Sequence, residues 1–252
     1  MHLQAIIFDF DGVIADSEHL HLRAFQDVLG NSGIPLTEAD YYARYLGLQD
    51  ADVFRAAARD ASAALGPARL AGMLARKAAR YQALIGNTSV LYPGIEARVR
   101  AWSRQVPLAI ASGSLRKEIN TILARVDLAG CFSAIVSAED VMRGKPAPDG
   151  YLKVLDALNA GLGHRAEALC RDRDTAQDHW ALAAQGFTPA SVVVIEDSVW
   201  GLQAARAAGM RTVAVTTSHA ADTLASAGAD LIVSSVGALD LAMLDRLVRD
   251  HQ

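Results

Sequence analysis

The sequence predicts an α/β protein with a doubly wound parallel sheet and an all-helical segment inserted after the first strand. From about residue 95 onward, short runs rich in Val, Ile and Ala alternate with helical patterns. Strands separated by single helices form parallel sheets that are covered on both faces. Between residues 37 and 85, by contrast, the chain is rich in Ala and Arg, with apolar residues three or four apart and no convincing strand.

We therefore expect two structural units. The α/β core would comprise residues 1–15 and 90–252, and a helical unit would comprise residues 16–89. A chain of 252 residues is long enough for a core and an inserted smaller unit. Asp16 and Ser17 are suitable N-cap residues for the helix that opens the insert, and Tyr92-Pro93-Gly94 marks the return to the core.

Within the core, the first buried strand starts at Ala5 and ends at Asp9-Phe10-Asp11-Gly12. The pattern then predicts strands at 107–111, 134–136, 191–195, 212–215 and 231–233, with helices at 95–105, 117–126, 147–158 and 199–208. We expect residues 218–252 to have no chemical role and to end in a helix that carries Leu239, Leu241, Leu244 and Leu247.

The segment between residues 159 and 189 is longer than a simple crossover between strands requires. Its charges alternate in sign, which is typical of a solvent-facing surface. Trp180, Leu182 and Phe187 nevertheless need to be buried. We expect a helical excursion from the edge of the core.

Composition excludes several classes of function. The net charge of −4 and pI near 6.0 give no electrostatic signature for nucleic acid or an anionic membrane. A mean hydropathy of +0.17 with 52% hydrophobic residues is typical of a compact protein without a membrane span. The N-terminal residues Met1-His2-Leu3-Gln4 do not resemble a secretory signal. The two cysteines do not indicate a disulfide framework. We therefore expect a cytoplasmic protein without a catalytic thiol.

The end of the first strand carries the strongest chemical signal. Asp9 and Asp11 are two residues apart, so their carboxylates converge unless the turn at Gly12 rotates the second one away. Two like charges in one place require a cation or a shared proton. A hard divalent ion, Mg²⁺, fits oxygen ligands best. The alternative is that both carboxylates only cap the following helix.

Other strands also end in polar residues. Ser112-Gly113-Ser114 follows the second core strand, and Glu196-Asp197-Ser198 follows the most apolar one. Gly144-Lys145-Pro146 supplies a cation before a helix. Because ligands of open parallel sheets bind beyond the carboxyl ends of the strands, these residues should meet at one edge. Taken singly, each has a purely structural explanation as a helix cap or a solvated charge.

These motifs resemble the four signatures of the haloacid dehalogenase-like hydrolases. The first signature corresponds to Phe8-Asp9-Phe10-Asp11-Gly12-Val13-Ile14. The later ones correspond to Ala111-Ser112-Gly113-Ser114, Gly144-Lys145-Pro146-Ala147-Pro148-Asp149 and Ile195-Glu196-Asp197-Ser198-Val199-Trp200-Gly201. Their order and spacing match across both core segments.

The resemblance implies a role for each matching residue. Asp9 would be the nucleophile that forms an aspartyl-phosphate, and Asp11 would be the general acid and then the general base. Ser112 would bind the transferring phosphoryl group, and Lys145 would neutralise nucleophile and phosphate. The implied Mg²⁺ ligands are Asp9, the backbone carbonyl of Asp11, Glu196 and Asp197.

The helical unit resembles the small cap of the subgroup that contains β-phosphoglucomutase and many sugar-phosphate phosphatases. In those relatives the cap closes over the site and selects the substrate. The substrate-binding residues expected here are Ser17, His21, Gly47, Gln49, Asp50, Lys77, Gly113 and Ser114. As alternatives, Lys77 and Tyr81 would be a pair on the surface of a helix, and His21 an ordinary hydrogen-bonded helix residue.

One departure from the mutase pattern concerns the turn after Gly47. The mutase has an arginine there that holds a substrate phosphate, whereas this chain has Gln49-Asp50. A carboxylate in that place repels a second phosphate, which favours a phosphatase over a phosphomutase.

We therefore expect a Mg²⁺-dependent phosphatase that hydrolyses a small phosphorylated metabolite, such as a sugar phosphate or a short organic acid phosphate, through an aspartyl-phosphate. A β-phosphoglucomutase-like phosphomutase is the alternative. Less favoured are a dehalogenase, which needs neither metal nor second acid, and a non-catalytic binding protein on the same scaffold. We expect a monomer or homodimer that binds neither nucleic acid nor membrane.

Overall fold

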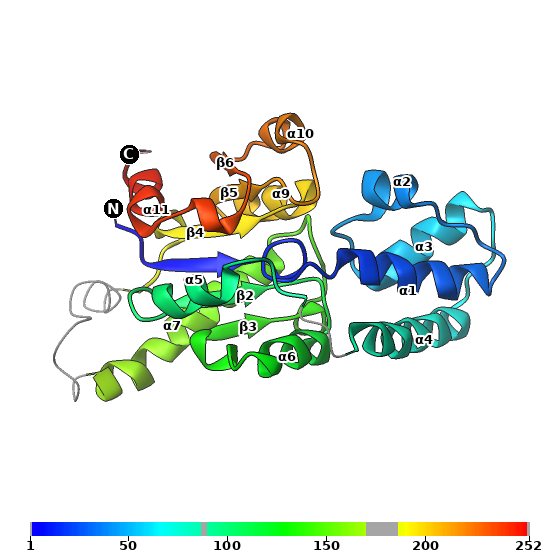
Figure 1. Ribbon diagram of the computed structural model, residues 1–252, viewed down its shortest axis with the longest axis horizontal. Helices are drawn as coiled ribbons and strands as arrows, with labels where there is room; N and C mark the ends of the chain where they lie inside the picture. The colour runs from blue at the N-terminus through cyan, green and yellow to red at the C-terminus, as the bar shows by residue number, and fades with distance from the viewer. Residues whose placement is uncertain (1, 87–89, 170–185, 251–252) are drawn as a thin grey trace.

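The computed structural model describes residues 2–86, 90–169 and 186–250. Their strands form one parallel sheet with the order β3-β2-β1-β4-β5-β6, and the predicted doubly wound α/β fold is confirmed (Figure 1). The strands are β1 (Ala5–Phe8), β2 (Leu108–Ala111), β3 (Ala134–Val136), β4 (Val192–Glu196), β5 (Arg211–Val215) and β6 (Leu231–Val233).

Strand β1 occupies the centre of the sheet, with Ile6 paired to Leu108 of β2 on one side and to Val193 of β4 on the other. After β1 the chain builds outward through β2 and β3, then crosses to the other side for β4, β5 and β6. The strand order therefore reverses between β1 and β4, which is where open parallel sheets bind their ligands.

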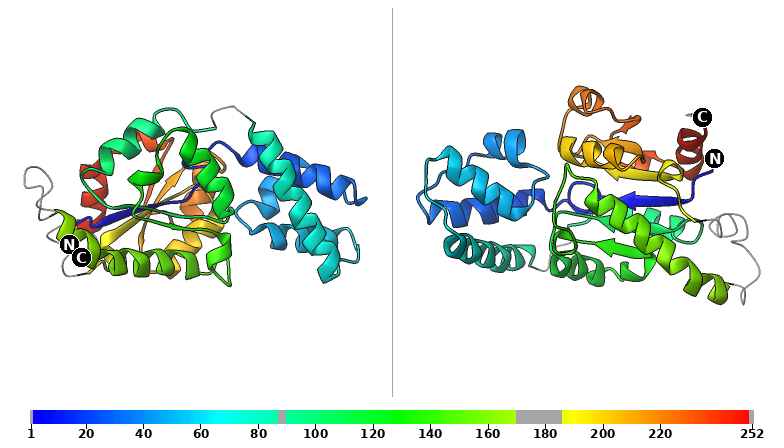
Figure 2. Two further views of the ribbon diagram at one scale, coloured as in Figure 1. Left: turned by 90° about the horizontal axis from the view of Figure 1, so that it is seen from below. Right: turned by 180° about the vertical axis from the view of Figure 1, so that it is seen from behind.

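Helices cover both faces of the sheet (Figure 2). One face packs against α5 (Ile95–Trp102), α6 (Arg116–Arg125) and α11 (Leu241–Arg249), and the other against α7 (Asp149–Leu169) and α9 (Val199–Ala207). A shorter helix, α10 (Ala221–Ser226), lies beside β6. None of the described helices, including α7 with its 21 residues, has the length and apolarity that a bilayer crossing requires.

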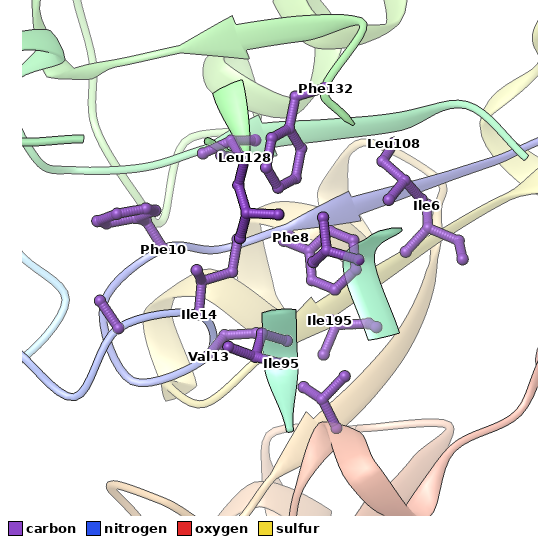
Figure 3. Close-up of a cluster of buried hydrophobic side chains, with 14 of the residues drawn as sticks. Ile6, Phe8, Phe10, Val13, Ile14, Ile95, Leu108, Leu128, Phe132 and Ile195 are labelled. Carbon is purple, nitrogen blue, oxygen red and sulfur yellow. The ribbon is translucent and has the colours of Figure 1, made fainter. Parts of the chain in front are cut away.

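Side chains along β1 point alternately to the two faces of the sheet, and each face has its own hydrophobic cluster. Ile6 and Phe8 point to one face, where the Phe8 ring lies 6.2 Å from the rings of both Trp102 and Phe132 (Figure 3). Ile7 points to the other face, among α7 and α9. Because both faces are covered, the strand contains no polar residue until it ends.

The inserted segment is helical, and we call its helices α1 to α4 the helical cap. It consists of α1 (Glu18–Gly30), α2 (Glu38–Asp40), a π-helical turn (Tyr41–Tyr45), α3 (Asp50–Asp60) and α4 (Pro67–Ile85). Phe25, Phe54 and Met73 belong to a hydrophobic cluster of its own. The cap lies beyond the carboxyl ends of the strands (Figures 1 and 2).

Two chain segments connect the cap to the core, and their backbones are hydrogen-bonded to each other. The Asp16 amide donates to the Val90 carbonyl at 2.6 Å, and the Tyr92 amide donates to the Ile14 carbonyl at 3.1 Å. The chain therefore enters and leaves the cap through two segments that are paired with each other.

Three local expectations need correction. Ser17 precedes α1, but its side chain does not cap the helix, because it donates to Asp11 instead. Leu239 lies before α11, which starts at Leu241 after Asp240 accepts a hydrogen bond from the Met243 amide at 2.7 Å. The helix predicted to end at residue 158 continues as α7 to Leu169, so the long segment after residue 159 begins as helix, as expected.

Within that long segment, the three aromatic and apolar residues have different outcomes. Phe187 is buried against the face that α7 and α9 cover, where it lies just ahead of the 3-10 turn Pro189–Ser191 that leads into β4. Trp180 and Leu182 lie outside the described residues, and their predicted burial stays a prediction.

Asp140, after β3, is a carboxylate whose contribution to stability depends on pH. Partial burial acts to raise the pKa of Asp140. Hydrogen bonds from Ser137 and the ion pair with Arg116 outweigh it and hold this pKa below its ordinary 3.8. The bonds from Ser137 are each 2.7 Å long. Because the pKa is lowered in the folded state, the stabilisation is complete at neutral pH and is lost as the pH falls below about 4.

We therefore expect Asp140→Ala to lower the free energy of unfolding by about 1–2 kcal/mol at pH 7. Urea unfolding of both proteins at pH 7 and near pH 3.5 measures this. The difference should shrink at the acidic pH, and an unchanged difference would contradict the role of the ionised carboxylate.

Candidate active site

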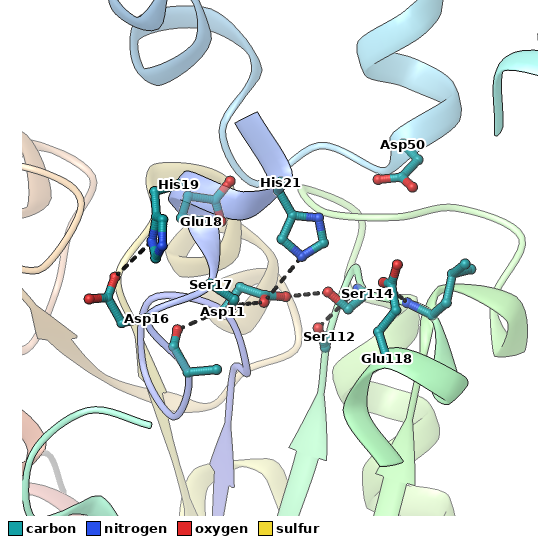
Figure 4. Close-up of polar contacts among 12 residues, drawn as sticks. Asp11, Asp16, Ser17, Glu18, His19, His21, Asp50, Ser112, Ser114 and Glu118 are labelled. Atoms are coloured by element: carbon teal, nitrogen blue, oxygen red, sulfur yellow. Dashed lines mark hydrogen bonds and ion pairs between the residues drawn. The ribbon is translucent and has the colours of Figure 1, made fainter. Parts of the chain in front are cut away.

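A cavity of about 50 Å³ lies between the carboxyl ends of the strands and the cap. Ten of the predicted site residues line it: Asp9, Asp11, His21, Gly47, Asp50, Ser112, Gly113, Ser114, Lys145 and Asp197. Figure 4 shows Glu18, His21 and Asp50 on the cap side and Asp11, Ser112 and Ser114 on the core side. Of the remaining four predicted residues, Ser17, Lys77 and Glu196 contact residues that line the cavity. The fourth, Gln49, packs against Gly144 beside it.

Lys145 joins the ends of β1 and β4. Its Nζ lies 2.8 Å from Asp9 Oδ1 and 2.6 Å from Glu196 Oε1, and its side chain is only 10% exposed. Burial opposes a charge on this amine, but the two carboxylates raise the pKa of Lys145 above its ordinary value. The lysine is therefore a fixed cation beside Asp9.

The carboxylates still outnumber this cation. Ligand oxygens of Asp9, Glu196 and Asp197 all lie within 4.8 Å of one another. Burial and the nearby charge of Glu196 raise the pKa of Asp9 to about 8, and the same two causes raise the pKa of Asp197 well above its usual range. A divalent cation that prefers oxygen ligands would relieve this repulsion, so the residues fit a Mg²⁺ site.

The three carboxylates are not equally available to a cation. Glu196 Oε1 accepts from Lys145 and, at 2.6 Å, from the Tyr151 hydroxyl, while Oε2 accepts from the backbone amides of Asp197 and Ser198 and from the Ser198 hydroxyl. These bonds use the lone pairs of Glu196. Asp9 Oδ2 and Asp197 Oδ1 accept no hydrogen bond within the described part of the chain. Asp9 and Asp197 are therefore the side chains best placed to hold a metal, with Glu196 supporting them.

Gly12 makes room for Asp197. Its φ of 80° is accessible mainly to glycine, and a Cβ at this position would lie 1.9 Å from Asp197 Oδ2. The turn after β1 can therefore approach the end of β4 only because residue 12 has no side chain.

Asp11 sits in a ring of hydrogen-bond donors. The Ser17 and Ser114 hydroxyls donate to its two oxygens, and His21 Nε2 lies 3.3 Å from Oδ1 (Figure 4). Burial acts to raise the pKa of Asp11, but His21 and the two hydroxyls outweigh it and lower the pKa to about 2. Asp11 is therefore ionised in this arrangement and ready to accept a proton.

Lys77 of the cap is completely buried and makes a network with three other residues. Its Nζ lies 2.7 Å from His21 Nδ1, 2.9 Å from Asp50 Oδ2 and 4.0 Å from Glu118 Oε1 of α6. An ammonium group can only donate, so Nδ1 of His21 accepts and the ring proton lies on Nε2, facing Asp11. The network thus links the cap to the core and fixes the orientation of His21.

The alternative that Lys77 and Tyr81 form a pair on a helix surface is wrong, because neither side chain is exposed. Helix α4 packs with α1, and the Tyr81 ring stacks on His21 with centroids 4.0 Å apart. Lys77 also lies 5.0 Å from the Phe25 ring centre. The core-facing side of α4 therefore contains both residues.

The turn from Gly47 to Asp50 touches the core at two points. A Cβ on Gly47, whose φ is 83°, would lie 3.2 Å from Ser198 Oγ. Gln49 packs over the backbone of Gly144, so that a Cβ there would lie 2.5 Å from Gln49 Cγ. Gln49 accordingly lines a second, smaller cavity of about 20 Å³, while Gly47 and Asp50 line the main one. These contacts close the cap against the core.

On the opposite wall, Ser112 and Gly113 precede α6. The Ser112 hydroxyl accepts a hydrogen bond from the Ser114 amide at 3.0 Å, which shapes the turn around the cavity. A hydroxyl and backbone amides in this place are suited to bind phosphate oxygens.

The expectation that residues 218–252 take no part in the site is wrong at their start. The Ser218 hydroxyl donates to Asp197 Oδ2, and His219 Nδ1 lies 3.1 Å from the Asp197 carbonyl. The Thr217 hydroxyl donates to the Gly12 carbonyl at 2.6 Å. These residues follow β5, and the rule that polar residues after parallel strands converge would have found them.

The sequence comparisons agree with this geometry. A family model described as haloacid dehalogenase-like hydrolase matches residues 3–209. The fructose-1-phosphate phosphatase YqaB of Escherichia coli is 32% identical over 212 residues, which cover 83% of this chain and 95% of that protein. Hexitol phosphatase B of Escherichia coli is 31% identical over 234 residues, which cover 92% of each protein.

Among solved structures, a β-phosphoglucomutase from Clostridium difficile superposes with a TM-score of 0.80. The alignment covers 99% of this chain and 98% of that one at 21% identity. At this level of identity the similarity supports the fold.

Proposed function

The chain belongs to the haloacid dehalogenase-like hydrolases, and on this basis we propose that it is a Mg²⁺-dependent phosphatase that acts on a small phosphorylated metabolite through an aspartyl-phosphate. The observation that carries the proposal is the position of Asp9: it directly follows the central strand, contacts the cation Lys145 at 2.8 Å, and lines a cavity together with Asp11 and Asp197. The named phosphatase relatives make a sugar phosphate the first substrate class to test.

The proposed reaction has two displacements at phosphorus. In the first, a carboxylate oxygen of Asp9 attacks phosphorus, the bond to the ester oxygen breaks, and Asp11 donates a proton to the departing alkoxide. In the second, Asp11 takes a proton from a water molecule, which attacks phosphorus and releases phosphate from Asp9. Lys145, the Ser112 hydroxyl and the Gly113 amide bind the phosphate oxygens in both steps.

Asp11 must be protonated for the first step, although its pKa is about 2 in the arrangement described. An approaching phosphate dianion raises the pKa of a nearby carboxyl by repulsion between like charges. The Ser17 and Ser114 hydroxyls can rotate, so they can accept from a protonated Asp11 as well as donate to the ionised one. The donor ring therefore supports both protonation states in turn.

The residues at the ends of β1 and β4 fit a divalent cation, with Asp9 and Asp197 as side-chain ligands and the Asp11 carbonyl as a further oxygen. When bound, Mg²⁺ supplies positive charge that offsets the negative charge of phosphate and nucleophile.

The metal can be tested without activity. We expect saturating Mg²⁺, at about 100 times its dissociation constant, to stabilise the protein by about 2.7 kcal/mol and to raise Tm by roughly 5–10 °C. Differential scanning fluorimetry measures this shift. Asp197→Asn should lose most of it, whereas Asp222→Asn on the exposed side of α10 should retain it. Equal shifts in both variants would contradict the proposed ligand.

Release of inorganic phosphate from a panel of sugar phosphates and short organic acid phosphates, with Mg²⁺ and with EDTA, tests the function. We expect turnover that EDTA abolishes and added Mg²⁺ restores. Failure to hydrolyse any ester, p-nitrophenyl phosphate included, would contradict the phosphatase proposal.

A phosphomutase is the second candidate, because residues of the cap and of the core line one cavity, and a cap that excludes water favours return of the phosphoryl group to a sugar hydroxyl. Against the mutase, Asp50 is an anion, and Lys77 is already paired with it, so this pair offers no free cation to a second phosphate. Formation of glucose 6-phosphate from β-glucose 1-phosphate without phosphate release would favour the mutase.

A further inference from the structure

The cap side of the cavity is lined by carboxylates. Glu18 of α1 and Asp50 of α3 both line it, on the side opposite Asp11 and Ser112 of the core (Figure 4). A phosphoryl group bound at Asp9 would therefore direct the remainder of its substrate toward Glu18 and Asp50. These two residues decide which chemical groups that remainder can carry.

The nearest cation cannot offset both carboxylates toward a ligand. Lys77 is completely buried and does not line the cavity, and its donors are directed at His21 Nδ1 and the two oxygens of Asp50. Glu118 adds a further carboxylate 4.0 Å from the same ammonium. The positive charge of Lys77 is therefore already paired with carboxylates of the protein itself.

No other lysine or arginine among the described residues is placed to bind an anion there. Lys145, the only one of them that lines the cavity, contacts Asp9 and Glu196. Arg116, at the start of α6, donates to the Ile135 carbonyl and to Asp140. The cap side consequently lacks a donor set for a second phosphate or a carboxylate.

Both carboxylates retain acceptor capacity. The Tyr41 hydroxyl donates to Glu18 Oε1, and Glu18 Oε2 accepts from none of the described residues. Each Asp50 oxygen receives one bond from Lys77, at 3.0 and 2.9 Å, and a carboxylate oxygen can accept two. Hydroxyl groups are the neutral donors that match such acceptors.

We propose that Glu18 and Asp50 are specificity-determining residues that select monophosphates whose remote part is a neutral polyhydroxyl chain, and that exclude bisphosphates and phosphorylated carboxylic acids. This inference rests on the proposed phosphatase function and narrows its substrate class. The exclusion arises because an anionic group would enter an environment of like charge with no free cation. The selection arises because each hydroxyl donates to a carboxylate oxygen of Glu18 or Asp50 that can still accept a hydrogen bond.

A matched pair of substrates tests the proposal. Sorbitol 6-phosphate and 6-phosphogluconate differ at the remote carbon, which carries a hydroxyl in the first and a carboxylate in the second. We expect kcat/KM to favour sorbitol 6-phosphate at least about 100-fold, as repulsion between charges a few ångströms apart predicts. Fructose 1,6-bisphosphate should be disfavoured similarly relative to fructose 1-phosphate.

Variants of Glu18 and Asp50 test whether these two residues cause the preference for sorbitol 6-phosphate. Glu18→Gln keeps an acceptor for Tyr41 but removes the charge, and we expect the 100-fold ratio to fall about tenfold. Asp50→Asn should lower it as well. Glu38→Gln on the exposed helix α2 is the control, and its ratio should match the unmodified protein. A ratio that neither cavity variant changes would overturn the assignment.

Two further results would overturn the proposal itself. One is hydrolysis of 6-phosphogluconate within threefold of sorbitol 6-phosphate. The other is a preference of more than tenfold for glucosamine 6-phosphate over glucose 6-phosphate, which would show a site for an amine. If no ester is hydrolysed, the proposed function fails, and titration calorimetry of Asp9→Asn with the same pairs still reports which remote group the cap side binds.

Discussion

Asp9→Asn is expected to reduce kcat by about 10⁴-fold or more for every phosphate ester that the protein hydrolyses. An amide of the same shape is a far weaker nucleophile than a carboxylate and cannot form the acyl-phosphate. Asparagine can still accept the hydrogen bond from Lys145, and it removes one of three crowded like charges. The free energy of unfolding of Asp9→Asn should therefore equal or exceed that of the unmodified protein.

Steady-state phosphate release and urea unfolding check both parts of this prediction. Asp16→Asn is a matched control, because Asp16 is exposed and its contact with His19 is long, at 3.7 Å. It should change neither quantity by more than about 0.5 kcal/mol. Retention of more than a tenth of the activity in Asp9→Asn would contradict the assignment of the nucleophile.

Gly201→Ala is expected to destabilise the protein by about 3 kcal/mol or more, although alanine is the better helix former by about 1 kcal/mol. A Cβ at Gly201 would lie 1.7 Å from Glu196 Oε1 and 1.9 Å from Glu196 Cδ. Glu196 is completely buried and receives its bonds from Lys145, Tyr151 and Ser198. Displacing this carboxylate leaves buried partners unpaired.

The measurement is the urea midpoint, and the control is Gly161→Ala in α7. A Cβ at Gly161 would meet no atom within 4 Å, so the same substitution should raise stability by about 0.5–1 kcal/mol. Phosphatase activity of Gly201→Ala should fall as well, because Lys145 loses one of its two anchors. Stabilisation by both substitutions would show that Glu196 tolerates displacement.

The catalytic edge of the sheet could be predicted from the sequence because chain order and hydrophobic period determine it. Buried runs such as Val192–Ile195 read as strands, the helices between them require parallel pairing, and parallel strands all end at one edge. Asp9, Ser112 and Asp197 each follow such a run, so their convergence depends on topology alone. The same reasoning extends to Ser218 after β5, whose hydroxyl donates to Asp197.

Other contacts could not be predicted in this way, because they join residues whose separation in sequence says nothing of their distance in space. Ser17 has the sequence position of a helix cap, yet its hydroxyl donates a hydrogen bond to Asp11. Lys77 and His21, 56 positions apart, meet because α4 packs against α1.

The sequence by itself therefore determined the parallel sheet, the helical insert and the edge at which the reactive residues gather, since local periodicity and connection length leave few alternatives. Only the tertiary structure decided which carboxylates are free for a ligand and which are already paired. Glu18 and Glu196 are indistinguishable as acids in the printed sequence, but one faces the cavity while hydrogen bonds occupy both oxygens of the other. Hydrogen-bond pairing depends on side-chain directions at the interface of cap and core, and those directions follow from packing rather than from sequence pattern.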